Sequence, residues 1–143
     1  MTATTPWPTE LRLAKDRRTL TVSFEGGESH ALSAEYLRVT SPSAEVQGHS
    51  PAERKTVPGK SAVQILAVEP VGNYAVRLSF DDMHSSGIYG WDYLARLGRE
   101  RDRIWGEYLA ELDAKGLSRE PRRQAEASRE PRRQAEASRE PRR

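Results

Sequence analysis

Alternating apolar and polar residues in the first part of the chain predict an antiparallel hairpin. The alternation covers residues 11–13 and 20–24 and is interrupted by the turn AKDRR. A period of two residues is typical of strands with one buried face. The Gly-Gly pair at 26–27 turns the chain again, and residues 29–32 have the length of a short third strand.

A short helix is predicted next, at residues 33–39 (SAEYLRV). Ser33 is a good N-cap, and the helical spacing directs Tyr36, Leu37 and Val39 toward the core. The following residues, 43–61, are polar and contain two prolines and two glycines. We therefore expect a long surface loop there, and such loops are often functional.

A second hairpin and a long helix are predicted in the second half. Residues 62–71 and 74–80 form strand patterns around a Gly-Asn turn and are expected at the centre of the sheet. Residues 85–91 (SSGIYGW) add a short strand or turn. Apolar residues then recur at three, four and seven positions, which indicates one amphipathic helix that ends at Gly116. They are Trp91, Leu94, Leu97, Ile104, Trp105, Tyr108, Leu109 and Leu112.

The last 26 residues are a repeat. The decapeptide SREPRRQAEA occupies 118–127 and 128–137, and SREPRR closes the sequence at 138–143. These residues include no apolar side chain larger than alanine, so we expect a disordered tail. The organisation is thus a flexible lead-in at 1–8, one α+β domain at 9–117 with a small antiparallel sheet of five or six strands, and the tail at 118–143.

Charge and composition exclude several functions. The tail carries nine arginines and five glutamates, so the net charge of +2 becomes −2 for the remainder. A folded domain without a basic excess is not expected to bind nucleic acid. Cysteine is absent, which excludes disulfides and thiolate-bound metals. We find neither a signal-peptide pattern nor a membrane-length apolar run, and we expect a cytoplasmic protein.

Short motifs occur in the order found in a known family. Together they resemble the N-terminal domain of gamma-butyrobetaine hydroxylases, which also occurs alone in bacteria as a domain of unknown function. The resemblance covers roughly residues 11–97. The motifs are Leu37-Arg38, Val71-Gly72-Asn73-Tyr74-Ala75, Asp82-Met83-His84, Gly87-Ile88-Tyr89 and Trp91.

The resemblance also implies a metal site that this sequence has lost. In the hydroxylases, three cysteines in a Cys-Pro-Cys-x-x-Cys group and the histidine of Asp-Gly-His hold a structural zinc ion. The matching positions here are Ser41, Ser43, Val46 and His84. A serine hydroxyl does not ionise near neutral pH and valine cannot coordinate, so we expect neither zinc nor another cofactor.

Oxygenase activity is not expected either. The iron site of these enzymes needs His-x-Asp and a distant histidine, and none of His30, His49 and His84 is followed by x-Asp. The sequence corresponds to the accessory domain without the catalytic domain, and it lacks the nucleophile elbow and the phosphate-binding loops of other enzymes. We therefore expect a non-enzymatic protein.

The cluster Asp81, Asp82 and His84 leaves two interpretations open. In the first, the carboxylates cap a turn and the His84 ring anchors the loop by hydrogen bonds in place of the lost metal. In the second, the three side chains and Arg38 surround a pocket under the long loop and bind a small molecule or a metal, or support a minor enzymatic activity.

The leading functional expectation is a protein–protein interaction domain with an unidentified protein partner. Tyr89 and Trp91 are expected to face opposite sides of an extended segment, and Arg38, His84, Tyr89 and Trp91 to form an interaction patch. In relatives the domain is also fused to ATPases of iron–sulfur cluster assembly, which suggests a role in metal-cofactor or iron–sulfur enzyme maturation. A homodimer formed through the sheet or the helix is a further expectation.

Overall fold

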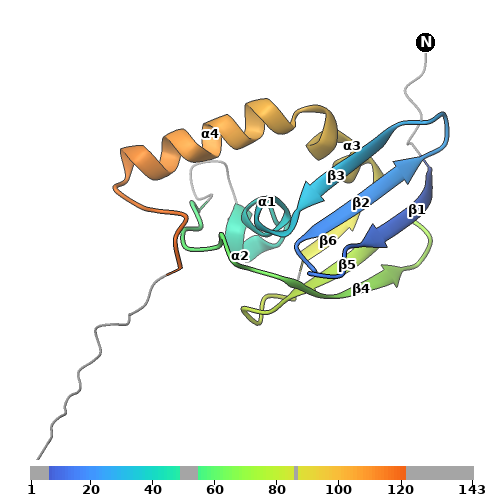
Figure 1. The fold of residues 1–143 in the computed structure, drawn as a ribbon, viewed down its shortest axis with the longest axis horizontal. Helices are drawn as coiled ribbons and strands as arrows, with labels where there is room; N and C mark the ends of the chain where they lie inside the picture. The colour runs from blue at the N-terminus through green and yellow to red at the C-terminus, as the bar shows by residue number, and fades with distance from the viewer. Residues whose placement is uncertain (1–6, 49–54, 86, 122–143) are drawn as a thin grey trace, which may run out of the picture.

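The computed structural model describes residues 7–48, 55–85 and 87–121 (Figure 1). Within them lie two antiparallel sheets of three strands, ordered β1-β2-β3 and β4-β5-β6, together with four helices. The α+β class predicted from the sequence is confirmed. The elements are β1 (Pro8–Leu13), β2 (Thr19–Phe24), β3 (Ser29–Ser33), α1 (Ala34–Val39), α2 (Ala44–Gln47), β4 (Ile65–Val71), β5 (Ala75–Phe80), β6 (Gly87–Gly90), α3 (Trp91–Arg99) and α4 (Arg101–Ala114).

The strands divide into two sheets because the chain leaves the first sheet through α1 before it starts the second. The expectation of one sheet is corrected here, and β5 alone occupies the centre of the second sheet, with β4 at its edge. Arg17 joins the two sheets. Its carbonyl oxygen accepts from the Ile65 amide at 2.8 Å, and its guanidinium donates to the Leu66 carbonyl at 3.0 Å.

One hydrophobic core is shared by both sheets, α1 and α3. The period-two pattern of β2 places Leu20, Val22 and Phe24 in it, each 3 % exposed or less. Helix α1 starts where it was predicted, because the Ser33 side chain accepts from the Tyr36 amide at 3.0 Å. In Figure 1 the strands gather at one end of the molecule. Helix α1 lies beside the ends of the strands, and α4 runs above it in this view.

The single long helix predicted after Trp91 is two helices, separated at Glu100. The two helices have different neighbours. The buried side chains of α3 belong to the main core, whereas Tyr108 and Leu112 of α4 form a second cluster with Val39. A single straight helix cannot follow both surfaces. Among the described residues, we find no helix with the length and apolar character that a membrane crossing requires.

The predicted loop and tail each contain ordered structure. Helix α2 lies within the predicted loop at 43–61, of which residues 49–54 are outside the described residues. At the C-terminus, residues 118–121 are part of the fold, because Arg119 forms an ion pair with Glu35 at 2.7 Å. The rest of the predicted tail, 122–143, and residues 1–6 of the lead-in lie outside the described residues.

Two helical glycines provide a test of how α3 packs on β3. A Cβ atom at Gly98 would lie 2.2 Å from Cγ of His30, whereas one at Gly106 would meet nothing within 4 Å. Gly98→Ala should lower the free energy of unfolding by about 1–3 kcal/mol through overpacking. Gly106→Ala should raise it by about 0.5–1 kcal/mol, because alanine favours the helix. Urea unfolding of both variants measures this, and equal effects would contradict the packing.

Candidate functional site

The C-terminal end of α1 carries the first half of the candidate site. The last carbonyl groups of a helix have no partner inside it, and two tyrosines supply partners here. The Tyr89 hydroxyl donates to the Leu37 carbonyl at 2.5 Å, and the Tyr93 hydroxyl donates to the Thr40 carbonyl at 2.6 Å. Burial raises the pKa of Tyr89 far above its ordinary value, so it remains a neutral donor. These bonds fix the position of the next residue, Ser41.

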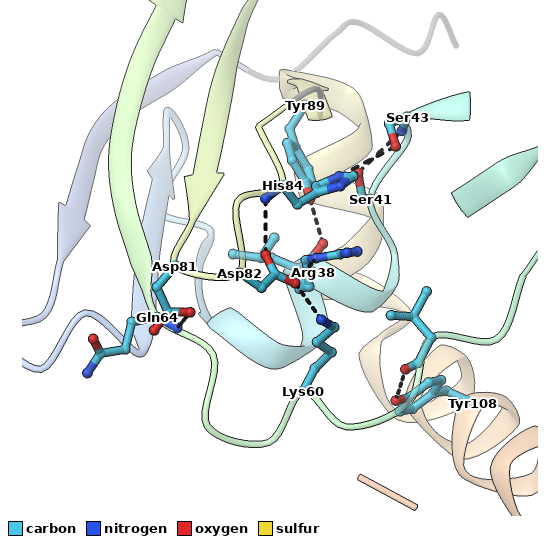
Figure 2. Close-up of polar contacts among 12 residues, drawn as sticks. Arg38, Ser41, Ser43, Lys60, Gln64, Asp81, Asp82, His84, Tyr89 and Tyr108 are labelled. Carbon is cyan, nitrogen blue, oxygen red and sulfur yellow. Dashed lines mark hydrogen bonds and ion pairs between the residues drawn. The ribbon is translucent and has the colours of Figure 1, made fainter. Parts of the chain in front are cut away.

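Ser41, Ser43 and His84 meet in a buried cluster (Figure 2). Nε2 of His84 lies 2.9 Å from Oγ of Ser41 and 3.4 Å from Oγ of Ser43. The three residues are 0, 8 and 5 % exposed. The hydroxyl of Ser41 also accepts from the Ser43 amide at 3.3 Å. Hydrogen bonds between the His84 ring and the two serine hydroxyls thus connect the loop after α1 to the turn after β5.

Asp82 forms a second, charged cluster below the histidine. One carboxylate oxygen, Oδ2, lies 2.8 Å from Nε of Arg38 and 2.6 Å from Nζ of Lys60, and the other accepts from the His84 amide at 3.2 Å. Burial raises the pKa of Asp82, but the Lys60 hydrogen bond and the Arg38 charge outweigh burial, so the pKa lies below its ordinary value. The carboxylate is therefore ionised and internally paired.

Asp81 points elsewhere. Its carboxylate accepts from the Gln64 amide at 3.1 Å, and its own amide donates to the Gln64 carbonyl at 3.0 Å, which ties the turn to the start of β4. Figure 2 shows Asp81 and the His84 ring directed to different sides of Asp82. In the described parts of the chain, no three His, Cys, Asp or Glu residues are placed to hold a metal ion.

A pocket under the long loop does exist, but only two of the four residues predicted to surround it do so. It is a shallow hollow of about 240 Å³, and Asp81 and Asp82 line it without His84 or Arg38. The other lining residues are Gly59, Lys60, Ala62, Val63 and Pro121. The second interpretation of the cluster, a site made jointly by Asp81, Asp82 and His84, therefore has no common cavity.

Met83 occupies the tip of the turn between Asp82 and His84. It is 87 % exposed and has φ 74°, in the left-handed region that favours glycine. The family pattern has glycine at this position. Met83 thus has a backbone conformation that glycine adopts more readily than methionine does.

The residues of the predicted interaction patch do not form an exposed surface. Positions two apart in an extended strand face the same side, so the expectation that Tyr89 and Trp91 face opposite sides is wrong. They are 0 and 7 % exposed, whereas Ile88, the residue before Tyr89, is 39 % exposed. The Trp91 indole donates to the Asn73 carbonyl at 2.9 Å, which holds the start of α3 against the turn between β4 and β5.

Two residues that shape the candidate site, Lys60 and Gly87, were not predicted from the sequence. Lys60 comes from the polar segment before β4, and nothing in its surroundings indicates that it reaches Asp82. Gly87 is required because a Cβ atom there would lie 2.8 Å from Oγ of Ser41 and 2.9 Å from the Tyr89 ring. Its place in the Gly-Ile-Tyr motif was the available signal, since glycine in a strand often marks a close approach.

Comparisons with known proteins identify the family of this chain. The family described as gamma-butyrobetaine hydroxylase-like, N-terminal, matches residues 11–95. This stretch includes α1, the loop after it that carries Ser41 and Ser43 (the serine loop) and the Asp82–His84 turn. The chain belongs to this family. A search of curated proteins gave no match. Among solved structures, a protein determined in solution by NMR is 47 % identical, with a TM-score of 0.73 over 83 % of this chain and 94 % of that one.

Two further structures are similar to this gamma-butyrobetaine hydroxylase-like N-terminal domain. A second NMR structure is 47 % identical, with a TM-score of 0.71 over 85 % of this chain and 92 % of that one. A crystal structure from Acidithiobacillus ferrooxidans ATCC 23270 is 38 % identical, with a TM-score of 0.54 over 64 % of this chain and 91 % of that one. That protein is described as one of unknown function from the DUF971 family.

The residues of this family member do not fit the zinc ion of the hydroxylases. Ser41, Ser43 and His84 meet where three ligands would meet, yet only the histidine is a good zinc donor. Val46, at the fourth matching position, is 2 % exposed and contributes apolar surface. A closed four-ligand site is therefore replaced by two hydrogen bonds and a buried valine.

The geometry predicts that zinc binding can be restored. In a tetrahedral site, a cysteine sulfur and a histidine nitrogen bound to one zinc ion lie about 3.5 Å apart, close to the present distances of 2.9 and 3.4 Å. Ser41→Cys/Ser43→Cys/Val46→Cys should retain about one zinc ion per chain after dialysis. Adding His84→Ala should weaken the affinity at least about tenfold. Elemental analysis measures both, and a zinc-free triple variant would contradict the assignment.

Asp82 provides a pH-dependent test. Because its pKa is lowered by folding, its contribution to stability is complete above the ordinary value of 3.8 and is lost as the pH falls through the folded value. Asp82→Asn should reduce the free energy of unfolding at pH 7 by about 1–2 kcal/mol, and the deficit should shrink below about pH 4. Urea titrations across this range test it, with the exposed Asp113→Asn as the control that should show no deficit.

Proposed function

We propose that this domain is a non-catalytic accessory module that acts by contact with a protein partner. The observation that carries the proposal is that the side chains able to support chemistry are used internally. The His84 ring faces two serine hydroxyls, and Asp82 is paired with Arg38 and Lys60. What remains for function is surface shape and charge.

A groove next to the serine loop supports binding. It has a volume of about 360 Å³ and lies between the loop after α1 and the helices α3 and α4. Its apolar lining residues are Val39, Pro42, Leu97, Ile104 and Tyr108, and its polar ones are Thr40, Gln47, Tyr93, Arg96, Arg103, Glu107 and Glu111. An apolar base with charges of both signs suits a protein segment that presents an apolar side chain flanked by charged ones.

The groove also supports a second candidate function, the binding of a small molecule. A volume of about 360 Å³ is within the range of small-molecule sites. A small-molecule function would therefore use the α3–α4 groove rather than the Asp81, Asp82 and His84 cluster. The family resemblance favours the protein partner, since relatives carry this domain fused to ATPases of iron–sulfur assembly. We propose metal-cofactor or iron–sulfur enzyme maturation as the setting, with a role that does not involve holding a cluster through thiolates.

Substitutions in the groove test this proposal. Arg96 and Arg103 have side chains that are 56 and 52 % exposed, so their removal should not disturb the core. We expect full-length Arg96→Ala/Arg103→Ala to bind a partner captured by the unchanged chain at least about tenfold more weakly, as is typical for central interface arginines. Affinity capture followed by measurement of the dissociation constant checks this result.

The matched control is Arg12→Ala, which removes a 71 % exposed arginine from β1. It should bind the partner as the unchanged chain does. Equal binding by the groove variant and the control would contradict the groove as the interface. If the groove variant instead loses a copurified small molecule, the second candidate function is supported.

A further inference from the structure

The first four residues of the C-terminal repeat occupy a peptide site on the domain. The Gly59 amide donates to the Ser118 carbonyl at 2.9 Å, and the Ser61 amide donates to the Arg119 carbonyl at 3.0 Å. The Ser118 hydroxyl accepts from the Glu120 amide at 3.0 Å. The backbone of residues 118–119 is therefore held by two hydrogen bonds from the segment before β4.

Arg119 supplies the side-chain contact of this segment. Its Nε and Nη2 atoms donate to the two carboxylate oxygens of Glu35 at 2.8 and 2.7 Å. Its guanidinium carbon lies 5.3 Å from the centre of the Trp105 ring. A bidentate ion pair with a carboxylate and a cation–π contact with an aromatic ring together favour arginine over lysine.

The receptor side of the contact is built into the core. Glu35 lies in α1, and its side chain is only 8 % exposed. Trp105 packs edge-on against Tyr36, with ring centres 6.0 Å apart. Removal of the partner of a buried charge is costly, because the charge is then left without compensation. Glu35 therefore creates a requirement for an arginine at this position, and residues 118–121 satisfy it.

The same ligand occurs three times in the sequence. Ser-Arg-Glu-Pro stands at 118–121, at 128–131 and at 138–141, and the second and third copies lie outside the described residues. We propose that Glu35, Trp105 and the backbone of residues 59–61 form a binding site for a Ser-Arg-Glu-Pro peptide, and that each of the three copies in the same chain can occupy it.

The length of chain between α4 and each Ser-Arg-Glu-Pro copy predicts how well that copy occupies the site. The first copy follows the helix α4 turn directly, whereas docking of the second or third copy closes a longer loop. Loop closure reduces the docked population roughly as the loop length to the power 3/2. Counted from the end of α4, the loops to the three copies have about 3, 13 and 23 residues, so the second copy should bind about tenfold less well than the first, and the third about twofold less well than the second. The later copies become occupants when the first is removed.

Amide hydrogen exchange in the full-length chain tests the proposal. The reporters are the Gly59 and Ser61 amides, which donate to the docked segment. Arg119→Ala should reduce their protection by up to about tenfold, and Arg119→Ala/Arg129→Ala should reduce it about twofold more. The variant with Ala also at Arg139 should lose the remaining protection. Arg129→Ala/Arg139→Ala is the matched control and should keep full protection.

Three results would overturn the proposal. If Arg119→Ala alone removes as much protection as the triple variant, only the first copy binds. If the triple variant keeps its protection, the arginine contact does not hold the segment. If the protection in Arg119→Ala falls on dilution, the later copies dock between chains rather than within one.

A synthetic peptide keeps the test valid if the triple variant is poorly folded. The hexapeptide Ser-Arg-Glu-Pro-Arg-Arg, added to the full-length triple variant, should restore protection at Gly59 and Ser61 and raise the melting temperature in proportion to the logarithm of its concentration. A peptide with alanine in place of the first arginine should do neither. Equal effects of the two peptides would overturn the assignment of the Glu35–Trp105 site as a receptor for this sequence.

Discussion

The arrangement of the candidate site depends on how the buried end of α1 is satisfied. The helix has only six residues, and its carbonyl groups at Leu37 and Thr40 face protein rather than water. Each receives the hydroxyl of a tyrosine, from β6 and α3 respectively, at 2.5 and 2.6 Å. An unpaired buried carbonyl costs about 1–3 kcal/mol, so these two bonds hold the helix end against the second sheet. The serine loop starts at that fixed end.

The same constraint explains how the two segments that meet at His84 are held together. In a closed metal site, the ion joins two segments that are distant in sequence. Here the His84 ring and the Ser41 hydroxyl join the same segments at 2.9 Å, and Asp82 adds a charged link to Arg38 in α1 and to Lys60 before β4. The two tyrosine bonds have already oriented the loop, so weaker bonds are enough to close it.

Periodicity and local signals predicted most of the elements. The N-cap at Ser33, the alternation in β2 and the turn at Gly72-Asn73 each act over a few residues, and local rules describe them well. The break at Glu100 could not be predicted, because it arises from packing of α3 and α4 against different partners. The family motifs identified Ser41, Ser43 and His84 as neighbours. They gave no sign of Lys60, whose contact with Asp82 depends on the path of a polar segment.

The tail shows why composition alone gives an incomplete prediction. Without large apolar residues, a segment cannot fold by burying its own surface. It can still be ordered by a partner that already contains an unsatisfied charge. Glu35 is such a partner, since its carboxylate is buried in α1 while Arg119 remains 44 % exposed. The ion pair with Glu35 therefore acts together with the hydrogen bonds from the Gly59 and Ser61 amides. The order of residues 118–121 depends on contacts with residues 59–61 and with α1, which are distant in the sequence and which composition does not indicate.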